Sequence, residues 1–371
     1  MRSGATAGCL WLALVVTFGV GAASAADPAA TFPKGPYGVT QALGTLLQPA
    51  TFGVPAGQPV ADVTAQVLSD GRLRAYVFAQ GQGIVTALSS DGKTFTAEGS
   101  AFGRDAAFGQ PRVIKLANGT YRMFANGGGG IQSASSADGK SFTADSGTRI
   151  SSSAAGEAAL SGPGIVRLAD GRYRAYFSGL GTPGSGPKPL KVQSAVSTDL
   201  TTWTVEAGVR VGAGAALSGS AEHPTVVTHA DGTVTLFYFR NTDGATGLWT
   251  ATSSDGLTFG DEEKLRLPGE PMDGNDPEVF LDASGRMIVW YGGFDHTVGG
   301  TVMGAVLGPA AQSIVSATQS SAQPTGSAVK PPPVTKKSVV QKKTITCVKG
   351  KVTKRVTGTK PKCPTGYKQK K

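Results

Sequence analysis

The chain has 371 residues, of which 40% are hydrophobic and only 16% are charged, with 53 glycines and 22 prolines. This composition, without any long Leu/Glu/Lys-rich run, argues against a helical bundle, a coiled coil or a doubly wound α/β fold. The net charge of +10 is unevenly spread, because residues 330–371 hold fourteen Lys and Arg and no acid. The rest of the mature chain holds 20 basic and 25 acidic residues. The basic pI therefore describes the tail and does not indicate that the body binds nucleic acid.

The N-terminus has the pattern of an export signal. Arg2 precedes an apolar run at residues 10–20 that is short for a bilayer span, and Ala23-Ser24-Ala25 offers a small-x-small cleavage site. We expect residues 1–25 to be a cleaved signal peptide and the protein to be secreted. A retained membrane anchor is the alternative.

The body repeats one unit five times. In each unit a β-like run leads to a turn glycine, and an aromatic residue follows five positions later in a second run. Such constant offsets across five copies predict a repeat architecture. The pairs are Gly71 and Tyr76, Gly119 and Phe124, Gly171 and Tyr176, Gly232 and Phe237, and Gly285 and Trp290.

Four of the five units carry a second motif, Ser-x-Asp-(Gly/Leu)-x-(Ser/Thr)-aromatic, at residues 89–95, 136–142, 197–203 and 253–259. Ser and Asp side chains can accept backbone N–H groups within a tight turn. A catalytic Asp is the alternative reading. Because the motif recurs at equivalent positions, we predict a structural turn with its aromatic residue packed back on the sheet.

Each unit of about fifty residues is long enough for a four-stranded antiparallel sheet, which is a propeller blade. We therefore predict an all-β fold, a five-bladed β-propeller of four-stranded antiparallel blades, over residues 26–308. The fifth unit lacks the second motif. We expect residues 37–49 to supply its outer strand, so that the ring closes without an unpaired edge.

The C-terminal part changes in composition. Residues 309–343 are rich in Ala, Ser, Pro and Lys and are predicted to be a linker, and residues 344–371 form a small basic tail with a hairpin pattern. Cys347 and Cys363 are the two cysteines of the mature chain, which predicts a disulfide in an exported protein. The tail is expected to hold the protein at an anionic cell-wall or membrane surface, or else to be a solvated tail. We expect no specific nucleic acid partner, and a monomer.

Propeller geometry predicts where a ligand site lies. The first strands of the blades start, and the second strands end, on one face, where axial pockets open. Nine residues before the turn glycines stand Asp62, Gln110, Gly162, His223 and Asp276, and Glu222 precedes His223. Carboxylates and a histidine converging on an axis indicate a pocket. The further candidates for ligand contacts on this face are Arg112, Asn126, Arg240, Asn275, Asp295 and His296.

The strand starts, the DGRYRAYFSG second strand and the Ser-x-Asp-Gly turn resemble five-bladed glycosidases of the glycoside hydrolase family 43 and 32 superfamilies. The turn is also similar to a shortened sialidase Asp box. The resemblance implies carboxylates at the first-strand starts of blades one to three, as base, orienting Asp and acid. Asp62 matches the first position, whereas Gln110 and Gly162 stand at the second and third.

Two hypotheses follow. In the first, the protein is a glycosidase with Glu222 as proton donor, Asp62 or Asp276 as base or nucleophile, and His223 orienting the glycan. In the second, it is a non-catalytic propeller that binds a glycan or a protein. No cofactor is required by either hypothesis, although His223 with Asp276 could hold a calcium ion.

Overall fold

The computed structural model describes residues 31–103, 108–181, 190–242, 245–268, 274–310, 343–349, 352–358 and 362–369. The predicted signal peptide and residues 311–342 of the predicted linker lie outside the described residues. Contacts divide the chain into two units, Met1–Gln312 and Ser313–Lys371, and each is described by itself. Within the described ranges, helices are too short or too polar to cross a membrane.

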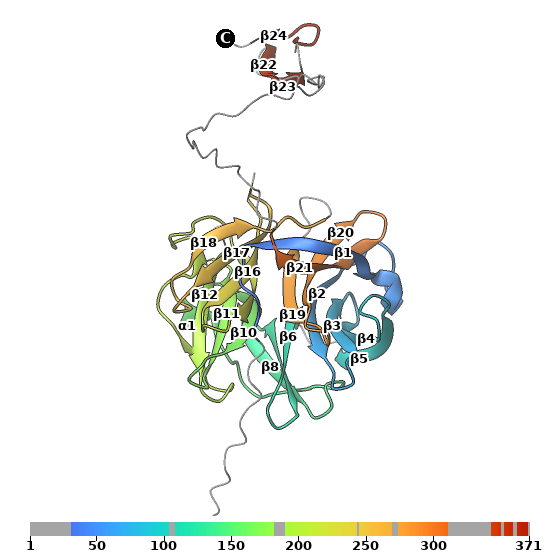
Figure 1. Ribbon diagram of the computed structural model, residues 1–371, viewed down its shortest axis with the longest axis vertical. Helices are drawn as coiled ribbons and strands as arrows, with labels where there is room; N and C mark the ends of the chain where they lie inside the picture. Colours follow the sequence, from blue (N-terminus) through green and yellow to red (C-terminus); the bar gives the residue numbers. More distant parts are fainter. Residues whose placement is uncertain are drawn as a thin grey trace, which may run out of the picture. The chain divides into compact units, whose positions relative to one another are not determined.

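The first unit is the predicted five-bladed β-propeller, and its first strands gather around the axis (Figure 1). Blades one to four each follow the chain as an antiparallel sheet, and β14 (Val211–Gly212) adds to the third. Their strands are β2 (Val60–Val67), β3 (Leu73–Ala79), β4 (Gly83–Ser89) and β5 (Thr96–Phe102); β6 (Gly109–Lys115), β7 (Tyr121–Gly127), β8 (Gly130–Ser136) and β9 (Thr143–Ala144); β10 (Leu160–Arg167), β11 (Tyr173–Gly179), β12 (Lys191–Ser197) and β13 (Thr204–Val205); and β15 (Glu222–Thr228), β16 (Val234–Arg240), β17 (Gly247–Ser253) and β18 (Gly260–Lys264).

The fifth blade closes the ring with a strand from the other end of the propeller. Its order is β1 (Tyr37–Leu47), β21 (Gly299–Pro309), β20 (Met287–Asp295) and β19 (Asn275–Leu281). The prediction that residues 37–49 form the outer strand of this blade is therefore confirmed. Pairing the first strand with the last removes an open edge from the ring. Two single-turn helices, η1 (Pro49–Phe52) and α1 (Ser152–Ala155), complete the described elements of this unit.

The Ser-x-Asp motifs form the predicted turns. In the second blade, Ser136 Oγ accepts the N–H groups of Asp138 (3.3 Å) and Gly139 (2.9 Å). The carboxylate of Asp138 accepts those of Lys140 (2.7 Å) and Ser141 (3.1 Å). The other three copies make the same bonds. The structural interpretation of the motif is therefore confirmed.

Each motif aromatic packs edge-on against the turn-plus-five aromatic of a neighbouring blade. Ring centroids are 5.5–5.9 Å apart and interplanar angles are 80–86°. Where the fifth blade lacks the motif, Tyr37 of β1 takes its place and contacts Phe237 at 5.2 Å. The five interfaces therefore each have one aromatic pair. The pairs are Tyr76 and Phe142, Phe124 and Trp203, Tyr176 and Phe259, Phe237 and Tyr37, and Trp290 and Phe95.

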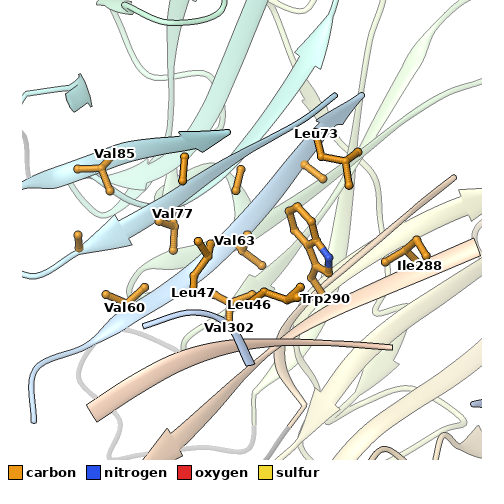
Figure 2. Close-up of a cluster of buried hydrophobic side chains, with 14 of the residues drawn as sticks. Leu46, Leu47, Val60, Val63, Leu73, Val77, Val85, Ile288, Trp290 and Val302 are labelled. Atoms are coloured by element: carbon orange, nitrogen blue, oxygen red, sulfur yellow. The ribbon is translucent and has the colours of Figure 1, made fainter. Parts of the chain in front are cut away.

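The hydrophobic core consists of layers between blades. Five clusters of buried side chains occupy the five interfaces. Figure 2 shows the layer between blades five and one, where Trp290 and Ile288 meet Val63 and Leu73, and Leu46 and Leu47 lie at the closing strand. Because every blade is packed on two sides, its second and third strands are nearly continuous runs of buried residues, whereas the outer strands β5 and β18 are largely exposed.

The second unit is a small sheet. Strand β22 (Lys343–Lys349) pairs with β23 (Val352–Gly358) as the predicted hairpin and also with β24 (Lys368–Gln369). Cys363 is disulfide-bonded. That its partner is Cys347 stays a prediction.

Candidate functional site at the propeller axis

The five first strands share one backbone irregularity. At the same place in each, the register with the second strand shifts, as in a β-bulge. One residue of each bulge adopts a left-handed conformation, which is uncommon for residues other than glycine. These residues are Asp62 (φ 60°), Gln110 (51°), Gly162 (55°), His223 (51°) and Asp276 (49°). Four of them are therefore strained, and strain of this kind concentrates at functional sites.

The bulges bring these five predicted positions together. They line one pocket on the axis with their neighbours Val63, Pro111, Arg112 and Pro163. The side chains of His223 and Asp276 are 18% and 13% exposed, so only a small part of each is accessible to solvent. The cavity is about 20 Å³, which is room for roughly one water molecule or one hydroxyl group.

Hydrogen bonds connect the five positions. The backbone N–H of Gly162 donates to Oε1 of Gln110 (2.7 Å), so the amide presents Nε2 to His223, whose Nε2 it contacts. On its other side, His223 Nδ1 pairs with Oδ1 of Asp276. Asp62 lines the same pocket and interacts electrostatically with Asp276. We call Asp62, Gln110, Gly162, His223 and Asp276 the axial cluster.

The surroundings of the two carboxyl groups of the axial cluster shift their pKa values in opposite directions. Burial raises the pKa of Asp62 well above its usual value, and the negative charge of Asp276 raises it further. Burial would also raise the pKa of Asp276, but the charge and hydrogen bond of His223 lower it below its usual value. Of the two, Asp62 is therefore the carboxyl group that takes up a proton more readily.

Two neighbours act on His223 in opposite directions. Burial lowers the pKa of His223, but the carboxylate of Asp276 raises it to about 9. Gln110 offers an N–H donor to the ring and so favours the neutral form. A full charge outweighs an amide dipole, so we expect a protonated ring at neutral pH. In the protonated ring, Nε2 of His223 is a donor, as is Nε2 of Gln110, so this contact then has no acceptor.

Gly162 shows why the third blade lacks an acid. A Cβ atom on Gly162 would lie 2.9 Å from both Cα and Cδ2 of His223. The imidazole of the fourth blade therefore occupies the space that a side chain from the third blade would need. His223 is fixed in that position by a hydrogen bond from its backbone N–H to Ser178 Oγ (2.8 Å).

Beside the axial cluster, Arg112 forms a buried ion pair with Glu278 that touches every blade. Arg112 also donates to the carbonyl oxygens of Pro163 (3.1 Å) and Pro277 (3.4 Å). Glu278, which is 6% exposed, accepts from Thr64 Oγ1 (2.9 Å), Ala65 N–H (3.1 Å) and Thr225 Oγ1 (3.5 Å). Burial lowers the pKa of Arg112 to about 10. The predicted ligand-binding Arg112 therefore has its hydrogen-bonding groups committed to the fold.

The other predicted site residues lie at different distances from the pocket. Glu222 is partly buried beside the axial cluster, and burial raises its pKa, but it does not line the pocket. Asn126 accepts the N–H of Gly109 (3.1 Å) next to Asp62, and Asn275 pairs with Gly292. Arg240 is buried in the fourth blade against Glu262. Asp295 is the exposed last residue of β20, and His296 begins the exposed loop that follows it.

A calcium ion fits the axial cluster poorly. Calcium takes six to eight oxygen ligands, whereas Asp62 and Asp276 are the two carboxyl groups that line the pocket, and Asp276 is already paired with His223. Among the residues that the structure describes, no group of three or more His, Cys, Asp or Glu side chains has the arrangement of a metal site. We therefore assign the metal no role.

Comparison with known proteins supports the fold. No family model and no curated protein sequence matches the chain. Solved structures do match: a thermostable family-43 glycoside hydrolase (TM-score 0.52, 16% identity, 68% of this chain and 90% of that one), an endo-1,4-beta-xylanase from Bacteroides thetaiotaomicron (0.53, 18%, 67% and 94%) and the GH43_1 enzyme from Xanthomonas citri complexed with xylotriose (0.52, 17%, 74% and 91%). The chain is thus a five-bladed propeller resembling family 43 glycoside hydrolases. At these identities, the likeness shows the fold alone.

Proposed function

We propose that the protein is a glycosidase-like propeller that binds a glycan at its axial face without hydrolysing it. The observation that carries this proposal is that Asp62 and Asp276 line one axial cavity of only about 20 Å³. Glycosidase carboxyl pairs stand about 5–5.5 Å apart for retention or roughly 6.5–9.5 Å apart for inversion, with the sugar or a water between them. A cavity with room for roughly one hydroxyl group does not hold a sugar ring between its two carboxyl groups.

The histidine of the axial cluster supports the same conclusion. Nδ1 of His223 pairs with the carboxylate of Asp276. A proton on Nδ1 is therefore directed at Asp276 and not at a glycosidic oxygen in the pocket. At the third-blade position, where the resemblance implies an acid, the ring of His223 lies over Gly162. The site therefore offers hydrogen bonds to a ligand hydroxyl but no acid and base placed across a glycosidic bond.

The experiment combines binding with turnover. The secreted chain is applied to an array of xylose, arabinose, galactose and glucose oligosaccharides, and the same sugars are assayed for new reducing ends. We expect binding without turnover, and His223→Gln should weaken the binding. Absence of binding to every glycan would contradict the proposal.

Hydrolysis is the second candidate, because Glu222 is a carboxyl group with a raised pKa next to the axial cluster. A raised pKa is what a general acid at neutral pH requires. Turnover that disappears in Glu222→Gln, while thermal stability stays unchanged, would establish this function instead.

For the tail we propose attachment to a polyanionic surface, supported by fourteen cations and no acid in residues 330–371. The full chain is tested on phosphatidylglycerol vesicles and on teichoic acid in rising salt, beside a chain that ends at Gln312. The full chain should bind and dissociate as salt increases. Equal binding by the shorter chain would contradict attachment through the tail.

A further inference from the structure

Phe294 is a solvent-exposed aromatic side chain beside the axial face. It is 54% exposed, and among the described residues Leu180, at 38%, is the other exposed large hydrophobic side chain. Single exposed hydrophobic residues are common on protein surfaces and need no function. The position of Phe294 relative to the axial cluster therefore decides whether it has one.

Strand β20 passes Asp276 before it reaches Phe294. Gly292 pairs with Asn275, and a Cβ atom on Gly292 would lie 3.6 Å from Oδ2 of Asp276. Phe294 follows two residues later, about 7 Å further along the strand toward the face where the pocket opens. Alternate residues of a strand point to the same side, so Phe294 and Gly292 share a side. Gly292 and Gly293 have no side chains, so neither residue blocks the space between the phenyl ring of Phe294 and Asp276.

The loop around Phe294 is held in place. The carboxylate of Asp295 accepts the N–H groups of Thr297 (2.7 Å) and Val298 (2.9 Å). The carbonyl oxygen of Val298 accepts the N–H of Gly57 (2.9 Å), which ties the loop to the segment before the first blade. An aromatic surface at the end of a strand with a fixed turn binds with a smaller loss of conformational entropy than one on a free loop.

The ring has one neighbour at its edge. His296 meets Phe294 at a centroid distance of 5.4 Å and an interplanar angle of 80°. This edge contact fixes the orientation of the phenyl ring, while more than half of its surface remains in water. His296 also adds a polar group to the rim, at a position that the sequence predicted for ligand contacts.

From this arrangement we infer that Phe294 is the stacking platform of a sugar subsite at the mouth of the axial pocket. The ligand must combine an apolar face with hydroxyl groups, since the exposed ring follows, two residues along the same side of β20, the residue that approaches Asp276. A pyranose or furanose ring has both. It lies with its C–H face on Phe294 and sends one hydroxyl toward Asp276 and His223, where the cavity of about 20 Å³ admits one such group. This inference rests on the proposed glycan binding.

The test compares substitutions at the two exposed hydrophobic positions. Affinity for xylotriose, and for the oligosaccharide that gives the strongest array signal, is measured by titration calorimetry. Phe294→Ala should lower the affinity at least tenfold, whereas Phe294→Trp should retain it and Leu180→Ala should leave it unchanged. Because Phe294 is more than half exposed, its replacement should shift the thermal midpoint by less than 2 °C.

Phe294→Trp provides a second readout. Its indole should change fluorescence when the sugar is added and should become less accessible to acrylamide. Wild-type affinity in Phe294→Ala, with no fluorescence change in Phe294→Trp, would overturn the platform while leaving the proposed function intact. If the unmodified protein binds no sugar at all, the proposed function itself fails, and the two failures are thereby distinguished.

Discussion

Gly162 is the residue on which the geometry of the axial cluster depends most. Its left-handed φ of 55° and the 2.9 Å approach of His223 both disfavour a side chain. We predict that Gly162→Ala lowers the free energy of unfolding by about 3 kcal/mol or more, as strain and overpacking add. Gly232→Ala is the matched control, because Gly232 also has a positive φ (81°) but no atom near its would-be Cβ. Denaturant titration should show the larger loss at Gly162. Equal losses would mean that His223 does not occupy this space.

His223 gives the axial cluster a pH dependence. Its pKa of about 9 in the folded chain lies above the value of about 6.5 expected when unfolded. Its contribution to stability is therefore fully present below pH 6.5 and is lost as the pH rises to 9, by up to about 3 kcal/mol. Denaturant titrations across this window should show the decline.

The matching variant for this prediction is His223→Gln, which should flatten the decline between pH 6.5 and 9. The contribution of Asp62, whose pKa is also raised, is lost in a window that begins lower, near pH 4. A slope that persists in His223→Gln would assign the pH dependence to another group.

Among the elements, the Ser-x-Asp turns stabilise the blades without taking part in the site. Asp138 accepts two backbone N–H groups, and these bonds lower its pKa. We predict that Asp138→Ala costs about 1–2 kcal/mol of unfolding free energy, because two donors lose a charged acceptor. Asp70→Ala is the control, since Asp70 only pairs with Arg72 in an exposed turn. Glycan binding should be unchanged in both. A loss of glycan binding in Asp138→Ala, but not in Asp70→Ala, would mean that the motif takes part in the functional site.

The repeated elements could be predicted from sequence because their signal is local. The five turn glycines and their aromatic partners predicted the blades. The constant offsets in the first strands predicted that Asp62 and Asp276 lie at one pocket. Local offsets in the sequence give no information about packing between blades. That His223 fills the space above Gly162, that Glu278 pairs with Arg112, and that Phe294 stays in water depend on contacts between distant residues.

At the scale of the whole molecule, polar contacts at the axis connect the five blades, between which the hydrophobic layers lie. The ion pair of Arg112 and Glu278 reaches all five blades and is almost excluded from solvent. Arg112→Met should therefore cost about 3–5 kcal/mol, because a buried carboxylate loses its partner. The double variant Arg112→Met with Glu278→Leu should recover most of that loss. If the single and double variants are equally unstable, the pair is not the source of the effect.

The central claim is that the axial carboxyl groups bind a sugar hydroxyl and do not cleave a glycosidic bond. One proton NMR time course of the full chain with xylotriose and the array-selected oligosaccharide tests it directly, because saturation transfer reports binding and new anomeric signals report hydrolysis in the same tube. We predict saturation transfer to the sugar with no new anomeric signal over days. New reducing-end signals that are absent with Glu222→Gln would contradict the account.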